Sequence, residues 1–262
     1  MTQSERRVYL ISELLKEQPD ISLKDIPLDE ENQRSIMRAL MNIRPPKAAD
    51  RTFLNVQNAY LKEEIRRKGI TYADNLIPMW ENLYLWQGDI TTLRCGAIVN
   101  AANSSLLGCF IPGHHCIDNA IHTFSGVQLR LACAELIAEQ GHKEYPGGAK
   151  ITPAFNLPSS YVIHTVGPVV SGAINSNNKK QLASCYRSCL NIADENGISS
   201  IAFCCISTGE FHFPNDAAAE IAVNTVKDYL KVTNSRIKVI FNVFKNCDYE
   251  IYRKLLGRSQ NS

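Results

Sequence analysis

The chain has 262 residues, of which 45% are hydrophobic and 21% are charged; this composition is typical of a globular protein with a sizeable core and excludes a disordered or fibrous chain. The formal net charge of +2 offers no general attraction to nucleic acid or to an acidic membrane. No apolar run approaches the roughly 18 residues that a membrane-spanning helix needs, so we expect neither a nucleic-acid partner nor a membrane partner.

The apolar pattern of the first 75 residues predicts three helices, over 5–18, 29–43 and 50–68. Pro27 and the Pro45–Pro46 pair separate them. We therefore expect residues 1–75 to form a small all-helical N-terminal extension that packs on the main domain and carries no chemistry of its own.

From residue 83 onward, predicted strands and helices alternate. The predicted strands cover 83–86, 97–100, 151–155, 161–166, 201–206 and 238–244, and the predicted helices cover 118–139, 180–196, 215–230 and 249–256. This alternation predicts an α/β domain over residues 76–262, with three α/β/α layers and a mixed central sheet.

Three loops follow predicted strands: GDI (88–90), NAANSSLLGCF (100–110) and STGEF (207–211). In α/β sheets, ligands bind in a crevice beyond the carboxyl ends of the strands. We therefore expect these loops to converge on one site, provided that the order of the strands brings them together.

The cysteine content indicates a reducing compartment. There are nine cysteines, an odd number without the regular spacing of a disulfide framework. Near the N-terminus, Glu13 and Lys16 interrupt the apolar patch before it reaches the length of a signal peptide. We expect a cytoplasmic protein whose thiols are either core residues or metal ligands.

The segment GCFIPGHHC (108–116) contains a candidate metal site, in which Cys109, His114 and Cys116 have the spacing C-x4-H-x-C. Zinc prefers thiolate and imidazole ligands, and three protein ligands with an open fourth position are typical of catalytic zinc. The alternatives are two core cysteines that happen to be close, or a structural zinc completed by Asp118 or His122. On spacing alone, His115 could replace His114 as the ligand.

Asp118 follows this segment directly, at the start of a predicted helix. It could cap that helix, or it could orient a water molecule or a substrate hydroxyl. Next to a helix N-terminus and a metal its pKa should be low, so it would position groups rather than protonate them.

Taken together, five motifs resemble the macrodomain, an ADP-ribose-binding α/β/α module: GDIT (88–91), AIVNAAN (97–103), IDNAIH (117–122), ISTGEF (206–211) and VIFNVFKNCDYEIY (239–252). Most macrodomains have a glycine-rich run where this chain has GCFIPGHHC. That replacement resembles the zinc-containing branch of the family, whose members carry a helical N-terminal extension.

The resemblance implies a hydrolase that uses one Zn²⁺ per chain to remove mono-ADP-ribose from a modified protein side chain, with Asp or Glu as the expected linkage. It also implies a protein substrate, such as a lipoyl-carrier protein modified by a sirtuin-type ADP-ribosyltransferase. Two rival functions stay open. One is a reader, a module that binds ADP-ribose without catalysis and whose zinc is structural; the other is a deacylase of O-acyl-ADP-ribose. A cysteine nucleophile is a further alternative, for which no third orienting group is evident.

Carried over residue by residue, the resemblance implies a catalytic pair, Asp118 and Asn103, of which Asn103 holds the distal ribose. The other expected ADP-ribose contacts are Asp89 and Ile90 at the adenine, Cys116 and Ile117 beside Asp118, and Ser207, Thr208, Gly209, Glu210 and Phe211 around the diphosphate. Phe244 either covers the adenine or packs within its strand.

Two departures from the family pattern stand out. Glu210 puts an acid where many relatives have an apolar residue, and the lost glycine run removes backbone donors for the diphosphate. Several other residues have structural interpretations: Asn100 as a strand-end cap, His164 as an isolated histidine, and Cys185, Cys189, Cys204 and Cys205 as core residues. His212 lies near the expected site.

Overall fold

The computed structural model describes residues 1–18, 20–21 and 26–257; residues 258–262 of the expected main domain lie outside this part of the chain. Three helices form the N-terminal segment: α1 (Gln3–Lys16), α2 (Glu30–Ile43) and α3 (Arg51–Lys68). Each begins at a side-chain cap, namely Thr2, Asp29 and Asp50, that accepts a hydrogen bond from a backbone N–H of the first turn. Their apolar faces bury a separate small core that includes Leu10, Leu14, Met37, Leu40, Phe53 and Tyr60.

A seven-stranded mixed sheet forms the centre of the molecule, in the order β2-β3-β9-β8-β5-β7-β6. Strands β3, β9, β8, β5 and β7 run parallel, whereas the two edge strands are antiparallel to their neighbours. The bounds are β2 (Pro78–Trp80), β3 (Leu83–Gln87), β5 (Ala97–Ala101), β6 (Ala149–Pro153), β7 (Tyr161–Thr165), β8 (Ser200–Phe203) and β9 (Lys238–Val243). A smaller parallel pair, β1 (Thr71–Tyr72) and β4 (Leu93–Arg94), and two short 3₁₀ turns, η1 (Ala73–Asn75) and η2 (Ile90–Thr92), were not predicted.

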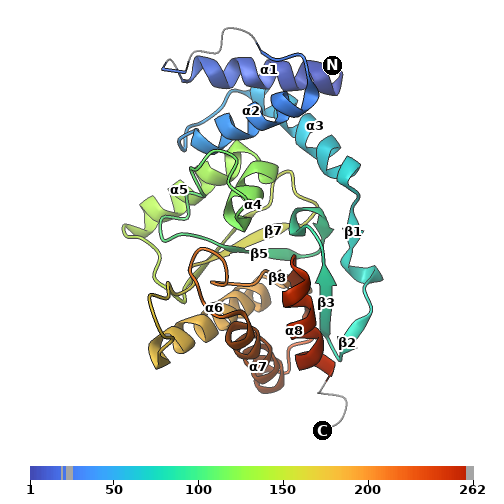
Figure 1. Ribbon diagram of the computed structural model, residues 1–262, viewed down its shortest axis with the longest axis vertical. Coiled ribbons are helices and arrows are strands. Elements are labelled where there is room, and N and C mark those ends of the chain that lie inside the picture. Colours follow the sequence, from blue (N-terminus) through green and yellow to red (C-terminus); the bar gives the residue numbers. More distant parts are fainter. Residues whose placement is uncertain (19, 22–25, 258–262) are drawn as a thin grey trace.

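Helices cover both faces of the sheet, which confirms the three-layer α/β/α prediction. Helices α6 (Ser176–Glu195), α7 (Asn215–Thr233) and α8 (Asn246–Gly257) lie on one face, and α4 (Ile117–Ser125) and α5 (Val127–Gln140) lie on the other. The N-terminal helices sit above α4 and α5, on the side away from the sheet (Figure 1). Cys185, Cys189 and Cys204 are buried in the main core, as predicted, and Cys205 is half-buried. In the described chain, no helix is both long and apolar enough to cross a bilayer.

The single helix predicted over 118–139 is wrong, because the chain breaks at Gly126 into α4 and α5. Gly126 has a φ of 100°, in the region that favours glycine. A Cβ atom there would lie 2.7 Å from the side-chain amides of Gln57 and Gln128. The break therefore depends on a contact with α3, about 70 residues away in sequence.

The strand predicted over 201–206 is too long, since β8 ends at Phe203. The carbonyl of Cys205 accepts hydrogen bonds from the N–H and the hydroxyl of Thr208, at 3.4 and 3.0 Å. The chain is therefore already turning, although its side chains stay apolar. The division of the chain at residue 75 stays a prediction.

Candidate active site

The order of the strands brings the three predicted loops to one edge of the sheet. Strands β3, β9, β8 and β5 are neighbours and run parallel, so the loops that follow them leave from the same edge. Asp89 lies after β3, Asn103 after β5 and Ser207 after β8. The edge therefore collects the residues expected to contact the adenine, the distal ribose and the diphosphate.

Asp118 is held by two asparagine amides. Its Oδ1 accepts a hydrogen bond from Asn100 Nδ2 at 2.8 Å, and its Oδ2 accepts one from Asn103 Nδ2 at 3.3 Å. Burial raises the pKa of Asp118 to about 6, although the two amides and the charge of Arg130 act in the opposite direction. Burial thus outweighs these stabilising contacts, and the expectation of a low pKa beside a metal and a helix N-terminus does not count burial.

Cys116, rather than Asp118, caps α4. Its Sγ accepts a hydrogen bond from the N–H of Asn119 at 3.4 Å, and Asp118 lies within the first turn with its side chain facing the interior. The helix-cap role considered for Asp118 is thus excluded. Its carboxylate does not cap the helix and instead accepts hydrogen bonds from Asn100 and Asn103.

Two histidines extend this polar cluster into the core. His164 Nδ1 lies 3.2 Å from Asn100 Nδ2, and His122 Nε2 lies 3.5 Å from Asp118 Oδ1. Burial lowers the pKa of His164 to about 3 and that of His122 well below its usual value, so both rings are neutral at pH 7. The structure thus assigns Asn100 and His164 to the surroundings of Asp118. Sequence reasoning missed both, although Asn100 stands at the end of β5, in the same motif as Asn103.

His122, His164 and Cys133 also form a group whose ligand atoms lie within 4.8 Å of one another. All three are buried, and His164 Nε2 already lies 3.0 Å from the hydroxyl of Thr152. Cys133 Sγ lies 3.6 Å from the same His164 nitrogen and the residue is fully buried, so this group is closed to solvent. We assign this group to the packing of the core.

The loop between β5 and α4 brings together the predicted metal ligands. The ligand atoms of Cys109, His114 and Cys116 all lie within 4.8 Å of one another, and the three residues are half-buried. Cys109 Sγ and His114 Nδ1 are 3.6 Å apart, close to the separation of about 3.4–3.8 Å between two ligands of a tetrahedral zinc. Among the described residues, neither Asp118 nor His122 joins this group. The donor set therefore fits a metal ion with a fourth position open.

Glu210 links the loop between β5 and α4 to the loop after β8. Its side chain is 70% exposed, and its Oε1 lies 3.6 Å from His114 Nε2. His114 therefore turns Nδ1 to Cys109 and Nε2 to a carboxylate. Metal-binding histidines commonly donate their second ring N–H to such a partner.

The loop after β8 offers unpaired backbone donors. Within the described part of the chain, the N–H groups of Gly209, Glu210 and Phe211 have no hydrogen-bond partner. Ser207 has a φ of 66° and is buried against Gly167, where a Cβ atom would lie 2.0 Å from the Ser207 hydroxyl oxygen. A rigid turn with free N–H groups is a suitable site for anionic oxygens.

Asp89 has strong partners at the other end of the site. Its Oδ1 accepts hydrogen bonds from the N–H and hydroxyl of Thr91, at 2.9 and 2.6 Å, and its Oδ2 accepts one from Lys68 Nζ at 2.9 Å. Burial alone would raise the pKa of Asp89, but the bonds from Thr91 and Lys68 outweigh it and lower the pKa. Ile90 is buried in η2, and Phe244 at the end of β9 is 76% exposed.

The N-terminal helices contribute side chains to both ends of this edge, and the expectation that they carry no chemistry of their own stays a prediction. Lys68 of α3 binds Asp89, and Arg38 of α2 donates a hydrogen bond to the carbonyl of His114 at 3.0 Å. Sequence spacing held no signal for these contacts.

Comparison with known proteins agrees with this fold. The Macro domain family matches residues 99–222. A protein of Treponema medium described as a protein-ADP-ribose hydrolase is 54% identical over 261 residues, which are 98% of this chain and 100% of that protein. A Staphylococcus aureus protein (strain MSSA476) with the same description is 48% identical, over 97% of this chain and 96% of its own. The Trypanosoma brucei macrodomain solved in complex with ADP-ribose is 27% identical, covers 84% of this chain and 95% of its own, and superposes with a TM-score of 0.65. With its fold and these relatives in agreement, the chain belongs to the macrodomain family.

Proposed function

We propose that this protein is a zinc-dependent hydrolase that removes mono-ADP-ribose from Asp or Glu side chains of modified proteins in the cytoplasm. The observation that carries the proposal is a buried carboxylate, Asp118, held by Asn103 next to an open Cys–His–Cys group. The descriptions of the Treponema medium and Staphylococcus aureus relatives support the same activity.

In this proposal, ADP-ribose lies along the edge of the sheet. Asp89 accepts a hydrogen bond from the adenine amino group next to Ile90, and the free N–H groups of the loop after β8 bind the diphosphate. The distal ribose then lies against Asn103 and Asp118, with Cys116 and Ile117 beside it. The ligand-bound Trypanosoma brucei macrodomain supports this kind of occupant.

The reaction breaks the bond between the anomeric carbon of the distal ribose and the protein. Such bonds break through a transition state that resembles an oxocarbenium ion, so water must be oriented and the developing charge stabilised. Asp118 has a pKa near 6 and is mostly ionised at pH 7, so it accepts a hydrogen bond from the water or ribose hydroxyl and can take up its proton. Asn103 orients that carboxylate and the sugar.

Cys109, His114 and Cys116 would hold the zinc ion. When bound, the ion supplies a Lewis acid that fixes a ribose hydroxyl or lowers the pKa of a water molecule. A reducing compartment is part of the proposal, because Cys109 and Cys116 bind a metal only when reduced, through their thiolates.

The test is the release of ADP-ribose from a carboxylate-modified protein, with and without a strong chelator, while bound zinc is measured in the same samples. A lipoyl-carrier protein modified by a sirtuin-type transferase is the first substrate to try. We expect turnover to disappear with the metal and to return when zinc is added. Cys116→Ser should lose turnover and still bind ADP-ribose, whereas Cys247→Ser, at an exposed thiol, should leave both unchanged.

Other results would select the rival functions. Full turnover without zinc would reject the metal and leave Asp118 and Asn103 as the catalytic groups. Binding of ADP-ribose without any turnover would favour a reader, and turnover confined to small O-acyl esters would favour a deacylase.

A further inference from the structure

The loop that holds the predicted metal ligands has no regular structure of its own. Between Gly108 and the start of α4, the chain forms no helix or strand, and Gly108 and Gly113 both have positive φ. Within this stretch of the described chain, the only hydrogen bond between backbone groups runs from the N–H of His114 to the carbonyl of Ile111. Its conformation must therefore depend on what it packs against.

Arg38 of α2 binds this loop and the first turn of α4 at the same time. Its Nη2 donates to the carbonyl oxygen of His114 at 3.0 Å, and its Nε and Nη2 donate to Asn119 Oδ1 at 3.1 and 2.8 Å. Asn119 in turn donates from Nδ2 to the carbonyl of Ile111 at 3.1 Å. One guanidinium thus fixes the loop relative to α4, the helix that Cys116 caps.

Asn42, one turn further along α2, makes a second connection. Its Oδ1 accepts a hydrogen bond from the N–H of Gly113 at 2.9 Å, and its Nδ2 donates to the hydroxyl of Thr123 at 3.0 Å. Residues four apart lie on the same face of a helix, so Arg38 and Asn42 together present four donors and acceptors to the loop and to α4.

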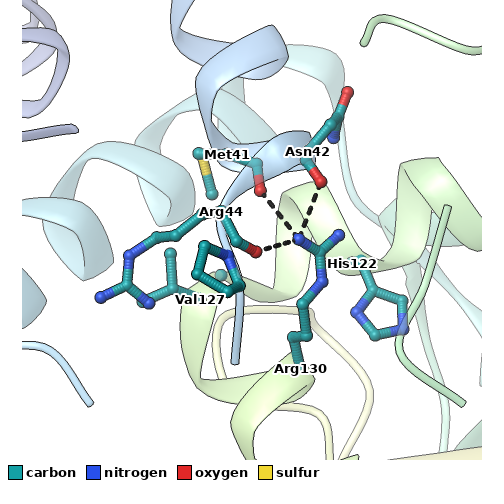
Figure 2. A pocket seen from close by; sticks show the side chains of 8 residues that line it. Met41, Asn42, Arg44, His122, Val127 and Arg130 are labelled. Carbon is teal, nitrogen blue, oxygen red and sulfur yellow. Dashed lines mark hydrogen bonds between the residues drawn. The ribbon is translucent and has the colours of Figure 1, made fainter. Parts of the chain in front are cut away.

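Arg130 of α5 fixes the end of α2 in place. Its Nη1 donates to the carbonyls of Met41, Asn42 and Arg44, which line a small cavity with His122 and Val127 (Figure 2). The same guanidinium lies 4.2 Å from the ring centre of Phe110 in the loop. The position of α2 and that of the loop are therefore set by one side chain of the α/β domain.

We propose that Arg38 and Asn42 are positioning residues for the metal site: the N-terminal helices hold the loop so that Cys109, His114 and Cys116 face one point before the ion arrives. Ordering a free loop costs backbone entropy for each residue that is fixed, and the folded protein has already met that cost here. The inference rests on the proposed zinc binding. It extends that binding to side chains that touch neither the metal nor the substrate.

The test is the zinc affinity of the full-length chain, measured by competition with a fluorescent chelator. We expect Arg38→Ala and Asn42→Ala each to weaken zinc binding by about tenfold or more, the size of effect typical of residues that orient metal ligands. Arg38→Lys keeps one donor but not the forked geometry, so it should recover part of the affinity.

Arg34→Ala is the matched control. Arg34 lies one turn earlier on α2, is 45% exposed, and pairs with Glu30 and Glu64 rather than with the loop. It should leave the zinc affinity within about twofold of the wild type, since such exposed ion pairs contribute little. Thermal melts of the metal-free variants show whether Arg38→Ala and Arg34→Ala differ in general stability. If Arg38→Ala does not fold, Asn42→Ala and Arg38→Lys decide the question.

Two results would overturn the proposal in different ways. If the wild type binds zinc and the Arg38 and Asn42 variants bind it equally well, the positioning role is rejected and the zinc site stands. If the wild type binds no zinc, the zinc site and the positioning role are both rejected.

Discussion

Asp118 and Asp89 stand at opposite ends of the candidate site and have opposite environments. The side chain of Asp118 is 8% exposed and is held by two neutral amides, whereas that of Asp89 is 37% exposed and pairs with Lys68. Burial raises the pKa of Asp118 to about 6, and the hydrogen bonds to Asp89 lower its pKa. One residue type is thus suited to proton transfer at one end and to recognition at the other.

The largest expected effect separates the two aspartates by activity. Asp118→Asn should reduce the rate of ADP-ribose release by about 100-fold or more, because an amide cannot take up a proton, while ADP-ribose still binds. Asp89→Asn should weaken ADP-ribose binding by about tenfold and change the rate at saturation little, because it removes a charged hydrogen-bond acceptor remote from the reaction. Turnover and calorimetric titrations of both variants check this. Equal losses in both would contradict the division of roles.

The second prediction concerns stability, measured on the metal-free protein. The folded-state pKa of Asp118 is raised above its unfolded value of about 3.9, so its stabilising contribution is full below pH 4 and is lost as the pH rises through 6. Asp118→Asn should therefore raise the free energy of unfolding at pH 7.5 by up to about 3 kcal/mol relative to wild type, less any misfit of its amide against Asn103, and this gain should vanish near pH 4.

Asp89→Asn should behave in the opposite way. The lowered pKa of Asp89 contributes stability that is present above its unfolded pKa and is lost as the pH falls through the folded one. The variant should therefore be less stable than wild type at pH 7.5, and the difference should close in acid. Urea melts of Asp118→Asn and Asp89→Asn at pH 7.5 and pH 4 check this. The account is contradicted if both variants shift the unfolding free energy at pH 7.5 in the same direction.

The smallest expected effect is at Phe244, which lies at the end of β9 on the same edge of the sheet. Because 76% of this residue is exposed, Phe244→Ala should change the unfolding free energy by no more than about 0.5 kcal/mol. If the ring covers the adenine, the variant should bind ADP-ribose about two- to tenfold more weakly, as expected for the loss of an aromatic pair. Unchanged binding would exclude the role of Phe244 at the adenine.

The alternation of strands and helices predicted the layers correctly, but two boundaries were wrong. The helix pattern over 118–139 is continuous in the sequence, and only the amide of Gln57 in α3 shows why the chain turns at Gly126. In the same way, the apolar run continues to Ile206 and gives no sign that β8 ends at Phe203, where the chain begins to turn toward Thr208. Periodicity reports which face is buried, and it does not report where a distant side chain interrupts an element.

The candidate metal ligands could be found from the sequence because they lie within one short segment. Cys109, His114 and Cys116 lie within eight consecutive positions, so their spacing in the sequence limits the distance between their side chains in space. Arg38 and Lys68 left no such signal. Arg38 acts on Asn119, 81 positions away, and an arginine on a helix surface is most often solvated.

The sequence by itself determined the family, the α/β order of the elements and the candidate ligands, because each depends on residues that are neighbours in the chain. Only the tertiary structure decided that Asp118 is buried with a raised pKa, that Cys116 rather than Asp118 caps α4, and that Arg38 and Asn42 of α2 contact the loop between β5 and α4. The pKa of a side chain depends on the loss of water and on charges brought close by folding. The hydrogen bonds of Arg38 and Asn42 depend on which face of α2 packs against the loop. Neither quantity is a property of local sequence.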